Sequence, residues 1–327
     1  MKLQTNIPLE KEGNPINYQS KLLLLGSCFV KNMGNKLKFY QFKTILNPFG
    51  ILFHPLAIEN LVSRAVKEKP YQAEEVFEQN GRWLCFDAHS DLAANSKDSL
   101  LENLNSTLQE TQKRLHSASH IMITLGTAWV YRNHSTQKIV ANCHKVPQKE
   151  FGKELLTIKE IESSLERTLE CISEVNKKAT VVFTVSPVRH LKDGFVENQR
   201  SKAHLIAAVN GFLSPQDVTL SQSKGRSRVH YFPSYEIMMD ELRDYRFYGK
   251  DLIHPNELAV DYIWERLKSV WISEEIYPVM EEVEGIQKGL EHRPLNPESE
   301  AHQKFRTSLE AKITYLKERY PLMHFER

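Results

Sequence analysis

Long hydrophobic runs are absent from this 327-residue sequence. None approaches the roughly 18 consecutive apolar residues that a membrane-spanning helix needs, so no membrane partner is predicted. The first 20 residues are polar and mixed in charge, without the apolar stretch that is typical of a secretory signal. These two absences favour a cytoplasmic protein.

Cysteine is scarce, and neither sign of charge dominates. The four cysteines are widely spaced and form no Cys-x-x-Cys pair, so free thiols are the simplest interpretation. The 43 basic and 41 acidic residues give a formal net charge of +2, which does not favour a nucleic-acid partner. The basic stretch at 221–228 is interpreted as a solvated surface loop rather than a binding patch.

Short apolar runs alternate with amphipathic stretches along most of the chain. Strands are predicted at 21–26, 44–46, 120–125, 180–185 and 229–232. Helices are predicted at about 29–39, 55–66, 96–117, 157–176, 197–213 and 256–270. Uniformly apolar strands that alternate with helices indicate a parallel sheet covered on both faces. The predicted fold is therefore an α/β class, three-layer α/β/α sandwich with a mostly parallel sheet.

Two hairpins and a helical tail are added to this sandwich. Asn80-Gly81 lies between two alternating apolar runs, which is a strong hairpin signal. The segments 129–131 and 138–141 flank a polar turn and predict a second hairpin. Everything after residue 272 looks helical, with a break at 294–297. We therefore expect a main domain over 1–272 and a helical C-terminal extension over 273–327.

Ser27 directly follows the first predicted strand, in the segment Gly26-Ser27-Cys28-Phe29. A nucleophile between a strand and a helix start would meet backbone N–H groups and the positive end of a helix dipole, which stabilise an oxyanion. A Gly-Ser pair can equally end a strand and cap a helix. Cys28 is an alternative thiol nucleophile, although a helix start would direct its side chain away from that of Ser27.

Asp251 and His254 form the second candidate group. At this spacing the carboxylate can hold one imidazole nitrogen and leave the other free as a base. Pro255 disfavours helical geometry at His254, so the histidine is expected on a loop before a helix capped by Asn256. A surface aspartate beside an unrelated histidine is the alternative.

Two further polar segments have two interpretations each. Asn142 and His144 either line a pocket, as a donor and a substrate contact, or end the second hairpin with Cys143 buried. Arg189 follows the fourth strand and either contacts a substrate anion or forms a structural salt bridge. No second Cys/His pair with ligand spacing accompanies Cys143 and His144, so no metal is predicted.

Six short words in this order resemble the GSCFA family, a divergent branch of the SGNH (GDSL) hydrolases. They are GSCF at Gly26, NPFG at Asn47, TLGTAWVY at Thr124, NCHKVP at Asn142, TVSPVRH at Thr184 and DLIHP at Asp251. The resemblance runs from about Lys21 to Trp271 and implies a flavodoxin-like SGNH sandwich. It implies Ser27 as nucleophile, His254 as general base and Asp251 as the residue that orients it.

The resemblance also implies an oxyanion hole, and here the sequence departs from the SGNH pattern. Ala128 stands where the third SGNH block carries asparagine, so a side-chain donor is missing from its usual place. Asn47 or Asn142, or backbone N–H groups of Gly126 and Thr127, are the candidate replacements. The residues predicted for the oxyanion hole are Ser27, Gly50, Gly126 and Asn142. The residues predicted to bind substrate are Asn47, Thr127, His144 and Arg189.

The predicted function is a serine esterase that removes a small O-acyl group from a carbohydrate or similar substrate through an acyl-enzyme. No metal or organic cofactor is required. The alternatives are an O-acyltransferase with the same triad and a non-catalytic binding or scaffold protein on the same fold. The expected partner is a small-molecule or glycan substrate, with no nucleic acid and no membrane; the sequence predicts no oligomeric state.

Overall fold

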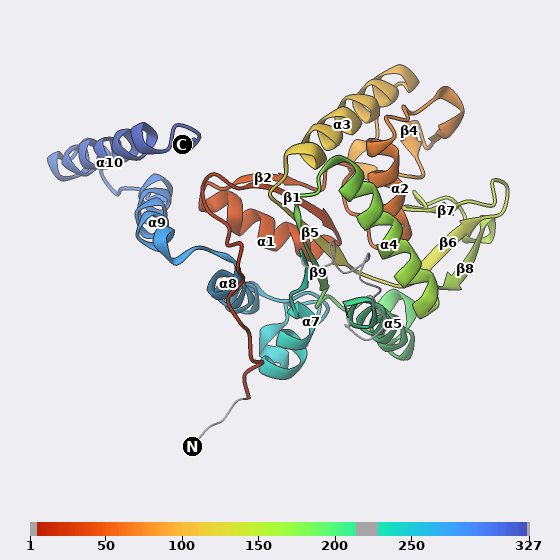
Figure 1. Cartoon of the computed structure of the whole chain (residues 1–327). Coiled ribbons are helices and arrows are strands. Elements are labelled where there is room, and N and C mark those ends of the chain that lie inside the picture. The colour runs from red at the N-terminus through yellow and green to blue at the C-terminus, as the bar shows by residue number, and fades with distance from the viewer. Residues whose placement is uncertain (1–4, 214–227, 326–327) are drawn as a thin grey trace.

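A five-stranded parallel sheet forms the centre of the protein (Figure 1). The structure is a computed structural model that describes residues 5–213 and 228–325, so the basic stretch at 221–228 lies outside the described residues except for Arg228. The strands run in the order β10-β9-β5-β1-β2, and all four pairings are parallel. Their bounds are β1 Lys21–Gly26, β2 Lys43–Leu46, β5 His120–Leu125, β9 Thr180–Val185 and β10 Val229–Tyr231. The predicted fold class is confirmed.

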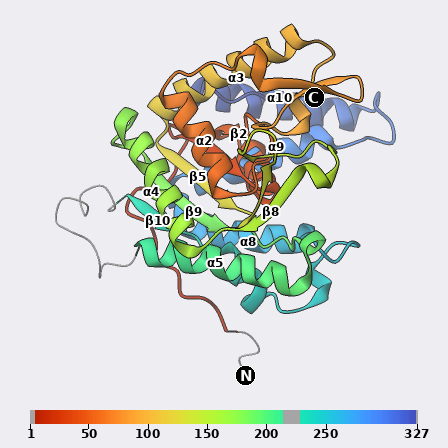
Figure 2. The same cartoon turned by 90° about the vertical axis from the view of Figure 1, so that its right-hand side faces the viewer.

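Helices cover both faces of this sheet (Figures 1 and 2). On one face lie α1 (Cys28–Phe39) and α8 (Glu257–Trp271); on the other lie α2 (Pro55–Val66), α3 (Lys97–Ser117), α4 (Ile158–Val175) and α5 (Phe195–Leu213). Side chains alternate along β1, so Leu22 and Leu24 belong to one apolar cluster while Leu23 and Leu25 belong to the other. The run of four leucines is uniformly apolar because both faces of its strand are buried.

Local capping chemistry fixes where several helices begin. Ser96 accepts a hydrogen bond from the N–H of Ser99 at the start of α3, and Asn256 accepts one from Ala259 at the start of α8. Thr157 and Glu160 form a reciprocal capping box at the start of α4. These starts agree with the sequence-based predictions.

Two antiparallel insertions extend from the sandwich. β3 (Val76–Gln79) and β4 (Arg82–Cys85) form the predicted hairpin, with Asn80 and Gly81 both at positive φ in its turn. The second insertion has three strands, β6 (Trp129–Asn133), β7 (Ile139–Val140) and β8 (Phe151–Leu155), in the order β7-β6-β8. The predicted second hairpin is present as β6 and β7, which pair at two residues. The third strand, β8, was not predicted and pairs along all of β6.

Several shorter elements connect these parts. The segment after β10 continues as α7 (Ser234–Glu236) and a π-helical turn, η6 (Ile237–Glu241). The 3-10 turns are η1 (Ala73–Glu75), η2 (Ser90–Leu92), η3 (Gln148–Glu150), η4 (Leu191–Asp193), η7 (Tyr245–Phe247) and η8 (Glu274–Ile276).

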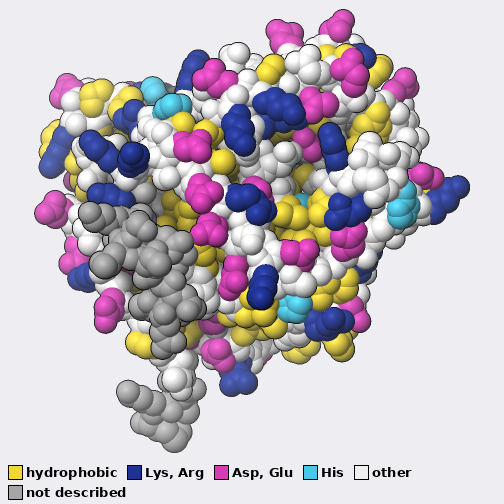
Figure 3. All heavy atoms as spheres, turned by 45° about the vertical axis from the view of Figure 1, so that its right-hand side comes forward, with side chains coloured by type: hydrophobic (Ala, Val, Ile, Leu, Met, Phe, Trp, Pro, Cys, Tyr) yellow, Lys and Arg dark blue, Asp and Glu magenta, His cyan; other side chains and the backbone are white. Residues whose placement is uncertain are grey.

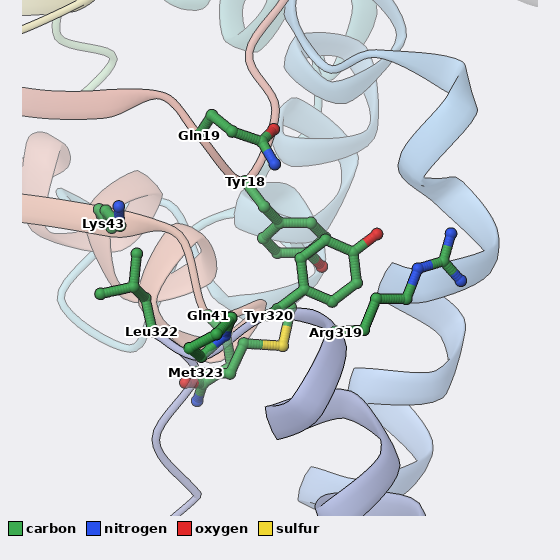
Figure 4. A pocket seen from close by; sticks show the side chains of 9 residues that line it. Tyr18, Gln19, Gln41, Lys43, Arg319, Tyr320, Leu322 and Met323 are labelled. Carbon is green, nitrogen blue, oxygen red and sulfur yellow. The ribbon is translucent and has the colours of Figure 1, made fainter.

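The C-terminal extension consists of α9 (Tyr277–Glu291) and α10 (Glu300–Arg319), which pack on the α1 side of the molecule. The Tyr40 hydroxyl donates to Glu284 at 3.0 Å, and Tyr320 lies against Tyr18 with ring centroids 5.0 Å apart. Figure 4 shows the shallow pocket that these two rings and Met323 help to line. The domain boundary after residue 272 stays a prediction, since the extension shares one apolar cluster with α1 and α8.

The face of the molecule shown in Figure 3 carries both signs of charge. Figure 3 shows basic and acidic side chains interspersed over the face in view, with small apolar areas between them. Over residues 5–213 and 228–325, no helix combines the length and apolarity needed to cross a membrane.

Candidate active site

The carboxyl ends of three neighbouring parallel strands bring the candidate residues to one edge of the sheet. Ser27 follows β1, Gly126 follows β5, and the segment from Ser186 to His190 follows β9. In open α/β sheets this edge is where ligands bind. The fold thus gathers parts of the chain that are far apart in sequence.

Ser27 occupies the N-cap position of α1 without acting as a side-chain cap. Its backbone is extended, with φ −68° and ψ 173°, and its hydroxyl makes no capping hydrogen bond. The side chain is fully buried, and Oγ has no hydrogen-bond partner within the protein. A buried hydroxyl is normally hydrogen-bonded, so this one lacks a structural explanation.

Gly26 and Asn47 hold Ser27 at the end of β1. Gly26 has φ +131°, and a Cβ there would overlap the carbonyl of Thr124 on the neighbouring strand. The Asn47 side chain accepts a hydrogen bond from the Gly26 N–H at 2.8 Å and donates to its carbonyl at 3.0 Å. Asn47 was predicted to bind substrate, but here both ends of its amide bond the backbone of Gly26.

The segment after NPFG also reaches this edge and meets Gly126. The N–H groups of Gly126 and Thr127 both donate to the carbonyl of Phe53, at 2.7 and 3.0 Å. A Cβ built on Gly126 would lie 3.0 Å from Ser27 Cβ. Gly126 and the segment after NPFG therefore both lie close to Ser27 at this edge.

The backbone groups predicted for the oxyanion hole already have acceptors. The N–H of Ser27 donates to Thr124 O at 3.0 Å, that of Gly50 to Asn47 O at 2.8 Å, and that of Gly126 to Phe53 O at 2.7 Å. None of the three is free in this structure, so their role as oxyanion donors requires these bonds to be exchanged and stays a prediction.

Asp251 and His254 form the expected pair. Imidazole Nδ1 of His254 lies 2.7 Å from Asp251 Oδ2, which leaves Nε2 on the far side of the ring. Asp251 Oδ1 accepts from the backbone N–H groups of Ile253 and His254 at 3.0 and 3.1 Å. The Ile253 N–H first, then the His254 ring and N–H, lower the pKa of Asp251 to about 2. Both side chains are about half exposed, at 51% for His254 and 48% for Asp251.

The loop after β9 lies beside this pair. The N–H of Arg189 donates to the carbonyl of Ile253 at 3.2 Å, which ties the two loops together. The Arg189 guanidinium lies over the rings of Tyr248 and Tyr245, at 4.4 and 5.1 Å from their centroids. Cation–π packing thus holds Arg189, which was predicted either to contact substrate or to form a salt bridge.

His190 and Lys202 complete the site, and neither was among the residues chosen from the sequence. Buried His190 Nε2 has no partner and lies 3.2 Å from the Cβ position built on Gly126. The buried Lys202 ammonium, from α5, donates to the carbonyls of Gly126 and Ser186, both at 2.7 Å. Burial lowers the pKa of Lys202 to about 7 and, with repulsion from Lys202 and His254, lowers that of His190 to about 3.

Asn142 and His144 belong to the insertions by their contacts. His144 is buried, with Nε2 2.7 Å from the Cys85 carbonyl oxygen and Nδ1 3.0 Å from Ser90 Oγ. Asn142 Oδ1 accepts from the N–H of His144 at 2.8 Å, in a turn where His144 has positive φ. These bonds fit the hairpin interpretation of this segment, whereas Cys143 is only partly buried.

The remaining candidates have structural contacts. Thr127 Oγ1 lies 3.0 Å from Ser201 Oγ and accepts from the N–H of Trp129. Burial raises the pKa of the Cys28 thiol, which disfavours the thiolate that a cysteine nucleophile needs. Within the described part of the chain, no group of three or more His, Cys, Asp or Glu side chains is arranged to hold a metal ion.

Comparison with known proteins identifies a family. No curated protein matches the sequence. A similar solved structure is an acetyl xylan esterase (Est2A) from the rumen bacterium Butyrivibrio proteoclasticus, at 11% identity and a TM-score of 0.37. The match covers 81% of this chain and 66% of that chain, and a likeness this low carries no argument about activity. Residues 21–267 match the GSCFA family, and residues 283–327 match the C-terminal domain of GSCFA domain proteins. The chain therefore belongs to the GSCFA family.

Proposed function

We propose that this protein is a serine hydrolase of the SGNH type, an esterase in which Ser27, His254 and Asp251 act as nucleophile, general base and orienting carboxylate. The observation that carries the proposal is the 2.7 Å contact between Asp251 Oδ2 and His254 Nδ1. It leaves Nε2 available as a base on a loop that is hydrogen-bonded to the segment beside Ser27. The unpartnered Ser27 Oγ supports the same assignment.

The reaction needs only groups of this chain and water. His254 Nε2 takes the proton of Ser27 Oγ as the oxygen attacks the ester carbonyl, and a tetrahedral oxyanion forms. Its collapse breaks the ester C–O bond, and His254 returns the proton to the departing alcohol. His254 then deprotonates a water molecule, which attacks the acyl-enzyme. Collapse of this second intermediate breaks the bond to Ser27 Oγ, His254 returns the proton to that oxygen, and the carboxylic acid leaves.

The surroundings of Ser27 favour a small acyl group. Its side chain has no exposed surface, and the space beside it is bounded by Gly126 and His190. A substrate therefore requires local opening at this edge of the sheet, and a short acyl group requires the smallest opening. An O-acyl group on a carbohydrate fits this requirement, with the sugar left outside the buried part.

A non-catalytic binding or scaffold protein is the competing function, and two observations favour it. Ser27 is fully buried, and the backbone N–H groups around it already bond to carbonyls. The Asp251–His254 pair opposes it, because Asp251 orients the imidazole and leaves Nε2 available as a base at an exposed position.

Labelling with a fluorophosphonate probe, followed by location of the adduct, tests the proposal. We expect one adduct, on Ser27, and none in Ser27→Ala. Ser164→Ala is a matched control, because Ser164 on α4 is also fully buried with an unpartnered hydroxyl. That variant should label like the wild type. An adduct elsewhere, or equal labelling of Ser27→Ala, refutes the nucleophile, and an inert wild type favours the scaffold.

A further inference from the structure

Acyl transfer at Ser27 requires a donor for the charge that develops on the carbonyl oxygen. In acyl transfer, preorganised N–H donors aimed at this oxygen are among the largest contributions to rate. The backbone N–H groups of Ser27, Gly50 and Gly126 all donate to carbonyls of the protein. The Asn47 amide bonds both the N–H and the carbonyl of Gly26. These groups are engaged within the protein, which makes a further side chain near Ser27 a candidate for the donor.

His190 is a partly buried side chain at this place, and its Nε2 atom is inaccessible and has no partner. Its Nε2 and Ser27 Cβ lie 3.2 and 3.0 Å from one point, the Cβ position built on Gly126, so the two side chains are close neighbours. Both Nε2 of His190 and Oγ of Ser27 are buried without a partner. Two unpartnered polar atoms on side chains that approach the same point are poorly satisfied as they stand and fit a ligand group placed between them.

The protein fixes the position of the His190 ring. The ring packs edge-on against Phe53, with centroids 5.5 Å apart. The backbone N–H of His190 donates to Asn198 Oδ1 at 2.9 Å. A donor held in this way needs little reorganisation as the oxyanion forms, which is what makes such a group effective.

Burial and nearby charges decide which form the His190 ring adopts. Burial, followed by repulsion from the Lys202 ammonium of α5 and from His254 of the neighbouring loop, lowers the pKa of His190 to about 3. The ring is therefore neutral at ordinary pH, with one nitrogen carrying a proton. A neutral imidazole with so low a pKa is a poor base for Ser27 but remains a competent N–H donor.

We propose that His190, through Nε2–H, donates a hydrogen bond to the oxyanion formed at Ser27 and so supplies the side-chain donor that Ala128 lacks. This assignment rests on the hydrolase function proposed above. It gives the two histidines of the site different roles: His254, oriented by Asp251, moves the proton, while His190 stabilises charge and keeps its own proton.

Rates of hydrolysis of p-nitrophenyl acetate as a function of pH test this assignment. His190→Ala should lower kcat about 10²- to 10³-fold, the usual effect of removing one oxyanion donor. The KM and the shape of the pH profile should stay unchanged, because the base is still present. The amide N–H of His190→Gln can reach the position of Nε2, so its kcat should be at least about tenfold higher than that of His190→Ala.

His120→Ala is the matched control. His120 is buried in the same sheet at the opposite end of β5, with Nε2 2.8 Å from Asn14 O and Nδ1 2.9 Å from Ser119 Oγ. Its removal should lower the melting temperature without a specific loss of kcat. A His190→Ala protein as active as the wild type, or one whose pH profile loses its acid limb, overturns the donor role while leaving the hydrolase standing.

A measurement on the wild type covers the case in which His190→Ala does not fold. After Ser27 reacts with the fluorophosphonate, the phosphonyl oxygen occupies the place of the oxyanion. The ¹⁵N-labelled imidazole of His190 should then show a protonated Nε2 with a downfield, slowly exchanging proton. An unchanged His190 resonance in the adduct overturns the proposal, and a wild type inert to both ester and probe overturns it together with the hydrolase function.

Discussion

Asp251 is the residue whose charge state the structure defines most sharply. Three hydrogen bonds reach its carboxylate, from the N–H of Ile253, the ring of His254 and the N–H of His254, and they hold its pKa at about 2. Because the folded pKa is below the unfolded value near 4, these bonds stabilise the protein above that pH and are lost as the pH falls toward 2. Asp251 therefore stays ionised, able to orient His254, across the usual assay range.

His254→Ala and Asp251→Asn should separate the base from its orienting group. His254→Ala removes the only proposed base, so turnover should fall by several orders of magnitude. Asp251→Asn should lower turnover less, since an imidazole remains and the amide oxygen can still accept from the N–H of Ile253. Both side chains are about half exposed, so neither change should unfold the protein.

Melting temperature and turnover measured on the same preparations decide this prediction. If the pair merely braces the start of α8, both variants should lose melting temperature together and any activity should follow the folded fraction. A stable His254→Ala protein with undiminished turnover would end the triad hypothesis.

The sequence could predict the triad candidates but not the whole site. Ser27, Asp251 and His254 stand in short recognisable words, each after a strand or before a helix. His190 gives no signal of its own in the sequence, because an unpartnered nitrogen is a property of packing. Lys202 did carry a signal: it lies four residues after Asn198 and three before Leu205, on the buried face of α5. A lysine in an amphipathic helix is ordinarily solvated, which is why this position was not selected.

At the scale of elements, the junction between β1 and α1 should tolerate no side chain at Gly26. A Cβ there would overlap the Thr124 carbonyl, and φ of +131° is strained for any other residue. Gly26→Ala should therefore cost more than ~3 kcal/mol of unfolding free energy, through strain and overpacking combined. Soluble yield and urea denaturation measure the effect.

Gly81→Ala provides the matched control for this junction. Gly81 also has positive φ, +73°, but nothing lies within 4 Å of its Cβ position. Gly81→Ala should lower the unfolding free energy by only about 1–2 kcal/mol, because the left-handed backbone is the only feature that disfavours alanine there. Equal losses in the two variants would show that the approach of β5 to Gly26 is not what requires glycine.

Strong local signals predicted most elements, and weak ones failed. The leucine run of β1, the Asn80-Gly81 turn and the capping box of α4 each agree with the structure. β8 was missed because Gly152, Lys153 and Glu154 interrupt its apolar pattern, and its pairing with β6 is a tertiary interaction. The helical turns from Ser234 to Glu241 follow Pro233 and are too short to produce a periodic pattern.

At the scale of the whole molecule, two apolar clusters meet at the sheet, and the one on the α1 side includes residues from both ends of the chain. The backbone N–H of Ile16 donates to the carbonyl of Trp271 at 2.6 Å, and Leu316 of α10 is fully buried in the same cluster as α1. The extension is therefore packed on the sandwich, on the side away from α2 to α5 (Figure 1). This packing leaves the carboxyl edge of the sheet to the loops that carry Ser27 and His254.

Lys202 should make the stability of the whole protein depend on pH. Its folded pKa of about 7 is below the ordinary value of 10.5, because burial disfavours the charged form. Between these two pH values the unfolded chain binds more protons than the folded one, so the unfolding free energy should rise with pH. The slope from this group is at most about 1.4 kcal/mol per pH unit. Below pH 7 Lys202 is protonated in both the folded and the unfolded state, so its contribution to the unfolding free energy no longer changes with pH.

Lys202→Met isolates this contribution from those of other titrating groups. The variant should lose the part of the slope between pH 7 and 10.5, as measured by urea denaturation at a series of pH values. At pH 7 it should also lose the two hydrogen bonds to the carbonyls of Gly126 and Ser186, whose unsatisfied acceptors each cost about 1–3 kcal/mol. The unfolding free energies of wild type and variant should therefore diverge as the pH rises. Parallel pH profiles would mean that Lys202 keeps its proton in the folded state, held by these two carbonyls against the cost of burial.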